Sequence, residues 1–382
     1  MSNFISYGQQ SIDSSDIKSV TKVLKSSYLT QGPQVKKFEQ ELQKKFKCKF
    51  SKVLSNASSA LFLIGKILKW KAGDVIAVPP ITFISSVNSV EHCGAKPLFV
   101  DINLNDYCMD PAKLEKELIR DKKKKIKAAI ITDYGGQPAQ WEKFYKLKKK
   151  YKITLINDNC HAMGSSIKQN EGYATKYADF TTLSFHPVKA ITTGEGGAIL
   201  TNNKALNKKA ALLREHGINR NSKKHWDYKV FNLGYNFRLP DLNCALGISQ
   251  LKKLKKFIAQ RRKISKIYDN LFNDKEKFVI PKRINNQVNS YHLYPILLNQ
   301  KKINKTKEEI LKEFLKYKIK LQVHYIPVNT QPFYKRKYGY NKKNYKNATL
   351  FFKNCISLPI YYDLKKIQIN YIKKICKKIF KI

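Results

Sequence analysis

The segments Asp158-Asn-Cys-His161 and Ser184-Phe-His-Pro-Val-Lys189 decide how this chain folds, together with Gly194-Glu-Gly-Gly197. Each of the first two follows a short apolar run, at residues 153–156 and 180–183, that predicts a buried strand. In open α/β sheets, ligands bind at the carboxyl ends of the strands. We therefore expect the chemistry of this protein to lie at that edge of an α/β sheet.

A carboxylate at one strand end, followed about one crossover later by a lysine on a constrained turn, is what a pyridoxal phosphate site requires. Asp158 would pair with the protonated ring nitrogen and keep the ring an electron sink, while the amine of Lys189 would bond covalently to the cofactor aldehyde. A lysine with the ordinary pKa of about 10.4 is a poor nucleophile at neutral pH, and burial beside a cationic ring would lower that pKa. Spacing alone leaves open that Lys189 is a solvated surface charge, but Phe185, Pro187 and the glycines that follow constrain its turn.

These segments also resemble the DegT/DnrJ/EryC1/StrS family of aminotransferases, which act on nucleotide-linked keto-sugars. The lysine segment and its glycines are similar to the family's cofactor-lysine motif, and Asp158 with His161 is similar to its Asp-x-x-His/Gln motif. The resemblance covers nearly the whole chain, through Leu29-Thr-Gln-Gly-Pro33, Gly234-Tyr-Asn-Phe-Arg-Leu-Pro240, His324-Tyr-Ile-Pro327 and Ser357-Leu-Pro359. Within the family it is greatest to the members of pseudaminic acid biosynthesis, through Tyr291-His-Leu-Tyr-Pro-Ile296, Gln322-Val-His-Tyr325 and Ser184-Phe-His186.

The resemblance implies a pyridoxal-phosphate-dependent transferase of fold type I, which is aspartate aminotransferase-like. This is an α/β fold with a mostly parallel central sheet and a smaller α+β C-terminal domain, and we expect the large domain over residues 1–250 and the small one over 251–382. The implied reaction moves an amino group from L-glutamate to the C4 ketone of a UDP-linked 4-keto-6-deoxy-N-acetylamino sugar. The resemblance leaves open that the sugar carries another nucleotide or is aminated at C3.

The resemblance further assigns cofactor contacts to five residues. Ser58 and Ala57, where a strand passes into an apolar helix, match the segment that binds the cofactor phosphate, although many members have glycine in place of Ala57. A helix N-terminus suits a phosphate, but a serine there is also an ordinary N-cap. Phe83 would stack on the cofactor ring, His161 would contact its ring oxygen, and Ser184 would complete the site.

Five more residues are implied to bind substrate or to cross between subunits. Asn236 would reach the cofactor phosphate of a neighbouring subunit, so we expect a homodimer with shared active sites. Arg238 would bind the carboxylate of the amino donor, and Thr30, His324 and Tyr325 would lie near the sugar. Judged by their local sequence alone, these five are ordinary turn, surface and core residues.

The rest of the chain predicts βαβ units followed by a smaller C-terminal part. Helical stretches separate predicted strands at residues 74–80, 96–101, 126–132 and 152–157. Residues 216–232 are polar and lack periodicity, so we expect a long loop there. Beyond them the pattern predicts a long helix at 240–267, strands at 290–298 and 319–323, and helices at 305–317 and 364–380.

The composition of the chain limits the classes of protein to which it can belong. The formal charge of +46 is compatible with a nucleic-acid-binding protein, which would bind with a steep dependence on salt. The excess consists of lysine, with 8 arginines among the 74 basic residues, whereas phosphate recognition favours arginine. We therefore expect no nucleic-acid partner. A pyridoxal-phosphate-binding regulatory protein without a transaminase half-reaction also stays open.

The seven cysteines are scattered without a Cys-x-x-Cys pair, which argues against a disulfide framework and a structural metal site. No apolar run approaches the roughly 18 residues that span a bilayer, and the start lacks a secretory signal pattern. We expect a cytoplasmic protein with reduced thiols, no metal and no membrane partner.

Overall fold

The computed structural model describes residues 4–219, 224, 226–339 and 344–382. Within these ranges a seven-stranded sheet forms the centre, in the order β1 (Phe50–Leu54), β8 (Gly197–Thr201), β7 (Phe180–Ser184), β5 (Thr154–Asp158), β4 (Ile126–Thr132), β2 (Val75–Val78) and β3 (Lys96–Phe99). The strands from β7 to β3 are mutually parallel, while β8 runs antiparallel to both of its neighbours. The sheet is therefore mostly parallel, as predicted.

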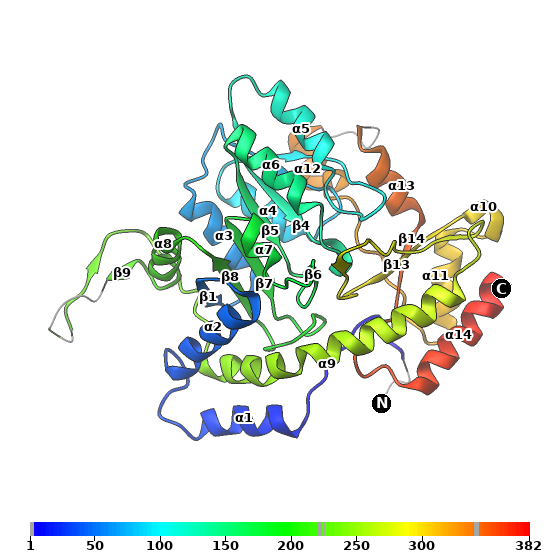
Figure 1. The fold of residues 1–382 in the computed structure, drawn as a ribbon, viewed down its shortest axis with the longest axis horizontal. Helices are drawn as coiled ribbons and strands as arrows, with labels where there is room; N and C mark the ends of the chain where they lie inside the picture. The colour runs from blue at the N-terminus through cyan, green and yellow to red at the C-terminus, as the bar shows by residue number, and fades with distance from the viewer. Residues whose placement is uncertain (1–3, 220–223, 225, 340–343) are drawn as a thin grey trace.

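Helices cover both faces of the sheet, which explains its apolar strands (Figure 1). Successive residues of β4 point into two different cores: Ala128 and Ile130 into one, Ala129 and Ile131 into the other. The first core is closed by α3 (Ala57–Ile67), α4 (Ile84–His92) and α8 (Lys204–Arg214). The second is closed by α5 (Pro111–Arg120), α6 (Trp141–Tyr151) and α7 (Tyr173–Tyr177). Burial on both faces is typical of parallel sheets joined by helical crossovers.

The helix α9 (Asp241–Leu271) runs for 31 residues along the molecule and packs into two further cores. Its first half contacts α1 (Ser14–Leu24) and α2 (Pro33–Phe46), and Asp241 accepts the backbone N–H groups of Gly32 and Gln34 at 2.7 and 2.8 Å. Its second half buries Ile264 and Tyr268 in the C-terminal core. The helix predicted at 240–267 is therefore present and joins the two parts of the chain.

The C-terminal part is built on an antiparallel sheet in the order β11 (Phe278–Val279), β13 (Tyr294–Leu298) and β14 (Cys355–Leu358). It also contains α10 (Gln300–Ile303), α11 (Lys307–Lys316), α12 (Pro332–Tyr338), α13 (Lys346–Asn354) and α14 (Lys366–Phe380). The beginning of the chain joins this core, because Ile5 exchanges backbone hydrogen bonds with Lys318 and Lys320. The mixture of helix and antiparallel strand agrees with the α+β expectation, while a domain boundary at residue 250 stays a prediction.

Two sequence predictions of secondary structure are wrong. Residues 319–323 form isolated bridges, from Ile319 to Ile5 and from Gln322 to Ser357, because the backbone finds a different partner on each side. Part of residues 216–232 forms the antiparallel pair β9 (Ile218–Asn219) and β10 (Lys229–Val230) instead of an irregular loop; residues 220–223 and 225 lie outside the described residues. Apolar and polar residues do not alternate along this strand pair, because neither of its faces packs against a hydrophobic core.

The cysteines at 48, 93, 108, 160, 244, 355 and 376 are free thiols in the structure. Among the described residues, no helix combines the length and the hydropathy that crossing a bilayer demands.

Candidate active site

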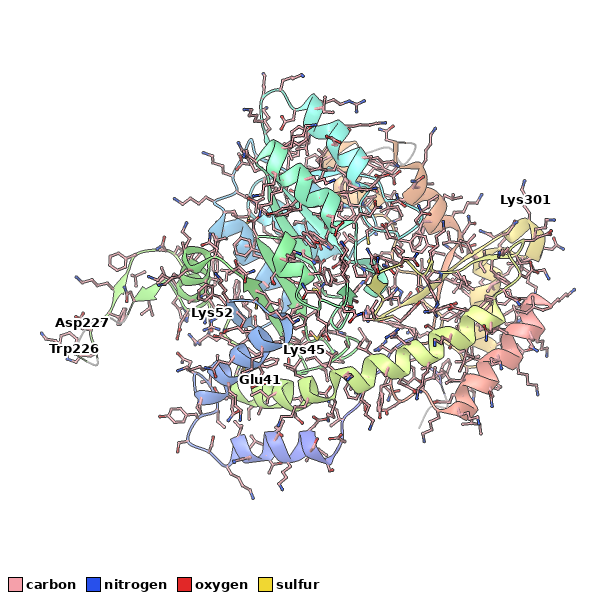
Figure 2. The ribbon with its side chains drawn as sticks, viewed as in Figure 1. Glu41, Lys45, Lys52, Trp226, Asp227 and Lys301 are labelled. Atoms are coloured by element: carbon pink, nitrogen blue, oxygen red, sulfur yellow. The ribbon has the colours of Figure 1, made fainter. Side chains whose placement is uncertain are left out.

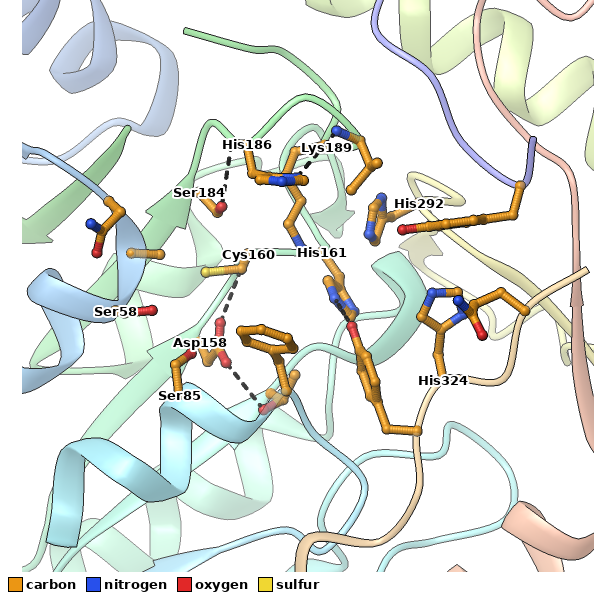
Figure 3. Close-up of a pocket in the computed structure, with 18 of the residues that line it drawn as sticks. Ser58, Ser85, Asp158, Cys160, His161, Ser184, His186, Lys189, His292 and His324 are labelled. Carbon is orange, nitrogen blue, oxygen red and sulfur yellow. Dashed lines mark hydrogen bonds between the residues drawn. The ribbon is translucent and has the colours of Figure 1, made fainter. Parts of the chain in front are cut away.

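A cavity of about 620 Å³ opens at the carboxyl edge of the central sheet (Figure 3). Thr132, Asp158 and Ser184, the last residues of β4, β5 and β7, all line it. The opposite wall comes from the C-terminal part, through His292 and residues 322–325. The cavity therefore lies where the strand ends predicted it, and both parts of the chain enclose it.

Lys189 reaches this cavity from the turn after β7 (Figure 3). Its backbone N–H donates to the carbonyl of His186 at 2.9 Å. Desolvation lowers the pKa of its amine below the ordinary value, against the opposing influence of Cys160 and Asp158. A larger fraction of the amine is therefore neutral near physiological pH than in an exposed lysine. The neutral form is the nucleophile and the proton acceptor.

Asp158 is almost fully buried at the end of β5 and is held by donors from three directions. Its carboxylate accepts the hydroxyl of Ser86 at 2.7 Å and the backbone N–H of Cys160 at 3.2 Å, and the hydroxyl of Thr132 approaches at 3.5 Å. These neutral donors fix the orientation of the carboxylate without neutralising it. Asp158 is therefore a pre-positioned anion on the floor of the cavity, and its charge acts on the amine of Lys189.

The first turn of α3 forms another wall, to which Ala57 and Ser58 contribute. Asn56 caps the helix by accepting the N–H of Ser59 at 2.8 Å. Strand β8 approaches this turn so closely that a Cβ at Gly197 would lie 2.5 Å from the backbone nitrogen of Ala57. A helix N-terminus with a neighbouring hydroxyl is a favourable place for a phosphate.

Aromatic and imidazole rings line the remaining sides. Phe83 is 52% exposed, and its ring centroid lies 6.1 Å from that of Tyr325. The ring of His161 lies 4.4 Å from that of His292, and the Nδ1 atom of His324 lies 3.0 Å from the hydroxyl of Ser357. Burial, followed by the charge of Lys189, lowers the pKa of all three histidines. These imidazoles are therefore neutral near physiological pH.

The structure brings most of the predicted residues together and leaves three apart. The cavity is lined by Ala57, Ser58, Phe83, Asp158, His161, Ser184, Lys189, His324 and Tyr325. Thr30 and Asn236 are exposed and Arg238 is partly buried, and none of the three lines the cavity of its own chain. The roles predicted for these three residues stay predictions.

Sequence analysis did not single out several residues that line the cavity. Tyr7 arrives on the N-terminal segment, and no local signal marks it. His292 stands among apolar neighbours in the sequence, as a core residue does, and Glu195 lies within the glycine-rich segment after the lysine motif, yet both line the cavity. Glu195 could have been found from its place next to the lysine motif.

The side chains of this cavity suit pyridoxal phosphate. A desolvated amine and an anionic carboxylate face one space, the first turn of α3 borders it, and an exposed phenylalanine offers a ring to stack on. These groups correspond to the aldehyde, the ring nitrogen, the phosphate and the ring plane of that cofactor.

Comparison with known proteins agrees with this chemistry. The model of the DegT/DnrJ/EryC1/StrS aminotransferase family matches residues 10–379. The chain belongs to this family. Its identity to the "UDP-4-amino-4,6-dideoxy-N-acetyl-beta-L-altrosamine transaminase" of Campylobacter jejuni strain 81-176 is 40%, over 97% of this chain and 96% of that protein. A protein of the same name from Helicobacter pylori is 34% identical over 94% and 93% of the two chains.

Solved structures described as aminotransferases share the fold of this chain. The H. pylori structure described as "PseC, aminotransferase involved in the biosynthesis of pseudoaminic acid" superposes with a TM-score of 0.92 at 32% identity, covering 99% of this chain and 100% of that one. The structure titled "Putative sugar aminotransferase Spr1654 from Streptococcus pneumoniae, PLP-form" gives a TM-score of 0.89 at 27% identity over 99% of each chain. These findings confirm the predicted family and fold, and this protein is an aminotransferase.

Proposed function

We propose that this protein uses pyridoxal phosphate to transfer the amino group of L-glutamate to the C4 ketone of a UDP-linked 4-keto-6-deoxy-N-acetylamino sugar. The observation that carries the proposal is the shared cavity of Lys189 and Asp158 in a chain of the aminotransferase family. The substrate follows from the names of the C. jejuni and H. pylori relatives. A nucleic-acid-binding function is not favoured, because family membership accounts for the whole chain.

When bound, pyridoxal phosphate supplies an electron sink that makes the α-proton of an amino acid acidic. Lys189 would hold the cofactor through its amine, and the lowered pKa of that amine suits it to move a proton to and from the reacting carbon. Asp158 would keep a proton on the ring nitrogen by its negative charge. Ser58 and the first-turn amides of α3 would bind the phosphate.

We further propose that the protein acts as a homodimer, because the arm formed by residues 215–219, 224 and 226–235 exposes large apolar side chains. Trp226, Phe231 and Leu233 are 63%, 64% and 86% exposed. The arm projects away from the sheet, with Trp226 near its tip (Figures 1 and 2). Exposed apolar clusters of this kind mark protein interfaces. An arm seated on a second subunit would also bring Asn236 and Arg238 towards the cavity of that subunit.

Two measurements test the proposal. Purified protein is incubated with pyridoxal phosphate, glutamate and a panel of nucleotide-linked keto-sugars, and NMR then locates the new amine. We expect a UDP-sugar aminated at C4, and amination at C3 or on another nucleotide would refute that part. Lys189→Ala should lose turnover and the absorbance of the covalently bound cofactor, whereas Lys208→Ala, on the exposed face of α8, should keep both. A Lys189→Ala protein that retains both would end the assignment.

A further inference from the structure

The imidazole of His161 has a hydrogen-bond partner at each ring nitrogen. The backbone N–H of Gly135 donates to Nδ1 at 3.3 Å, and the hydroxyl oxygen of Tyr325 lies 2.9 Å from Nε2 (Figure 3). Turning the ring over would place carbon atoms against both partners and lose both contacts. The two contacts therefore fix the orientation of the ring.

The partner at Nδ1 decides which nitrogen carries the proton. A backbone amide can only donate, so Nδ1 must offer it a lone pair. Burial, with the charge of Lys189, lowers the pKa of His161, so the ring is neutral and has a single N–H. That N–H is consequently on Nε2, and it donates to the hydroxyl oxygen of Tyr325.

The hydroxyl of Tyr325 accepts this hydrogen bond and must direct its own hydrogen elsewhere. Burial, with the charge of Asp158, raises the pKa of Tyr325, so the hydroxyl keeps its proton. Tyr325 lines the cavity, and its hydroxyl makes no other hydrogen bond to the residues that the structure describes. The hydrogen is therefore available to a group bound in the cavity.

We propose that Tyr325, oriented through His161 by the amide of Gly135, donates a hydrogen bond to an oxygen of the bound ligand. The acceptor is the ring oxygen of the cofactor or the keto oxygen of the sugar, and either is a good acceptor for a neutral phenol. His161 is then a positioning residue that acts through Tyr325, in place of the direct contact with the cofactor predicted from the sequence. The proposal rests on the proposed function for the identity of the ligand, whereas the direction of the hydrogen bonds follows from the two partners of His161 and from its neutral state.

The first test measures the tautomer directly. The ¹⁵N spectrum of histidine-labelled protein, with His161→Asn used for assignment, should show His161 neutral and protonated at Nε2. The same tautomer should persist in Tyr325→Phe, because the Gly135 amide and not the tyrosine selects it. A proton on Nδ1, or a charged ring at neutral pH, would overturn the proposal.

The second test identifies the acceptor with Tyr325→Phe, which removes the hydroxyl alone. The dissociation constant of pyridoxal phosphate from the protein and the KM for the nucleotide sugar are measured separately. The lost hydrogen bond should weaken one of the two by about 10-fold: cofactor affinity if the acceptor is the ring oxygen, KM if it is the sugar.

Tyr334→Phe is the matched control for this test. The Tyr334 hydroxyl also makes one hydrogen bond, to Asn88 at 2.6 Å, but lies outside this cavity, so both constants should stay unchanged. If Tyr325→Phe also leaves both constants unchanged, or if the control variant changes them equally, the proposal fails. Such a failure would leave the proposed function intact as long as Lys189→Ala still abolishes turnover.

Discussion

Replacing Gly197 with alanine should damage the cofactor site without touching any side chain that contacts the cofactor. The new Cβ would lie 2.5 Å from the backbone nitrogen of Ala57 and 2.6 Å from the carbonyl oxygen of Asn56. Carbon atoms pack at about 3.5–4.0 Å, so β8 or the start of α3 must move by about 1 Å. Both clashing atoms belong to the backbone, and therefore no change of rotamer can relieve the overlap.

Two magnitudes follow from this displacement. Overpacking of this kind costs about 1–3 kcal/mol of unfolding free energy. A shift of about 1 Å in Ala57 and Ser58 should also weaken phosphate binding, by up to about 100-fold if the effect matches that of a comparable misplacement on catalysis. Denaturant titration measures the first quantity, and absorbance titration of the protein with pyridoxal phosphate measures the second.

The control is Gly8→Ala, because a Cβ at Gly8 would make an ordinary contact of 3.5 Å with Val188. This variant should change neither quantity appreciably. If Gly197→Ala binds the cofactor with wild-type affinity, the close approach of β8 to α3 does not determine the shape of the cavity wall at Ala57 and Ser58, and the reasoning is wrong.

Three further outcomes are expected. Burial raises the pKa of Asp106 from 3.8 to about 6. Relative to Asp106→Asn, the native protein should therefore lose on the order of 3 kcal/mol of unfolding free energy as pH rises from about 4 to 6. Parallel curves of stability against pH for the two proteins, measured by denaturant titration, would contradict this. Changing Phe231 and Leu233 to serine should weaken the dimer by about 10⁶-fold, because its two arms together lose four side chains at about 2 kcal/mol each, and sedimentation showing an undiminished dimer would remove the interface proposed for the arm. Asp158→Asn should lower kcat by about 100-fold to 1000-fold while the protein stays folded, and a near-normal kcat would deny its charge a role.

The sequence predicted the cavity floor because strand periodicity and chemistry coincide there. Asp158 and Ser184 end two apolar runs, so their place at one sheet edge follows from the parallel order of β5 and β7. Phe83 is different, since an aromatic residue at a helix start is normally part of a core, and only the family resemblance indicated that it faces the cavity.

What the sequence could not predict depends on contacts between distant segments. His292 resembles a core residue in its apolar neighbourhood, and its position beside His161 requires the two parts of the chain to meet. Residues 319–323 alternate like a strand, yet their backbone bonds to Ile5 on one side and to Ser357 on the other. The relation of Tyr325 to His161 depends in the same way on the tertiary fold.

The pairing of Ile5 with residues 318–320 has a consequence for biosynthesis on the ribosome. Ile5 leaves the exit tunnel long before residues 318–320 and can pair with them only after their synthesis, and Tyr7 takes its place in the cavity only then. A nascent chain that has completed its central sheet would already hold Lys189 and Asp158 but would lack the wall with His324 and Tyr325. Cofactor capture should therefore follow the synthesis of the C-terminal part.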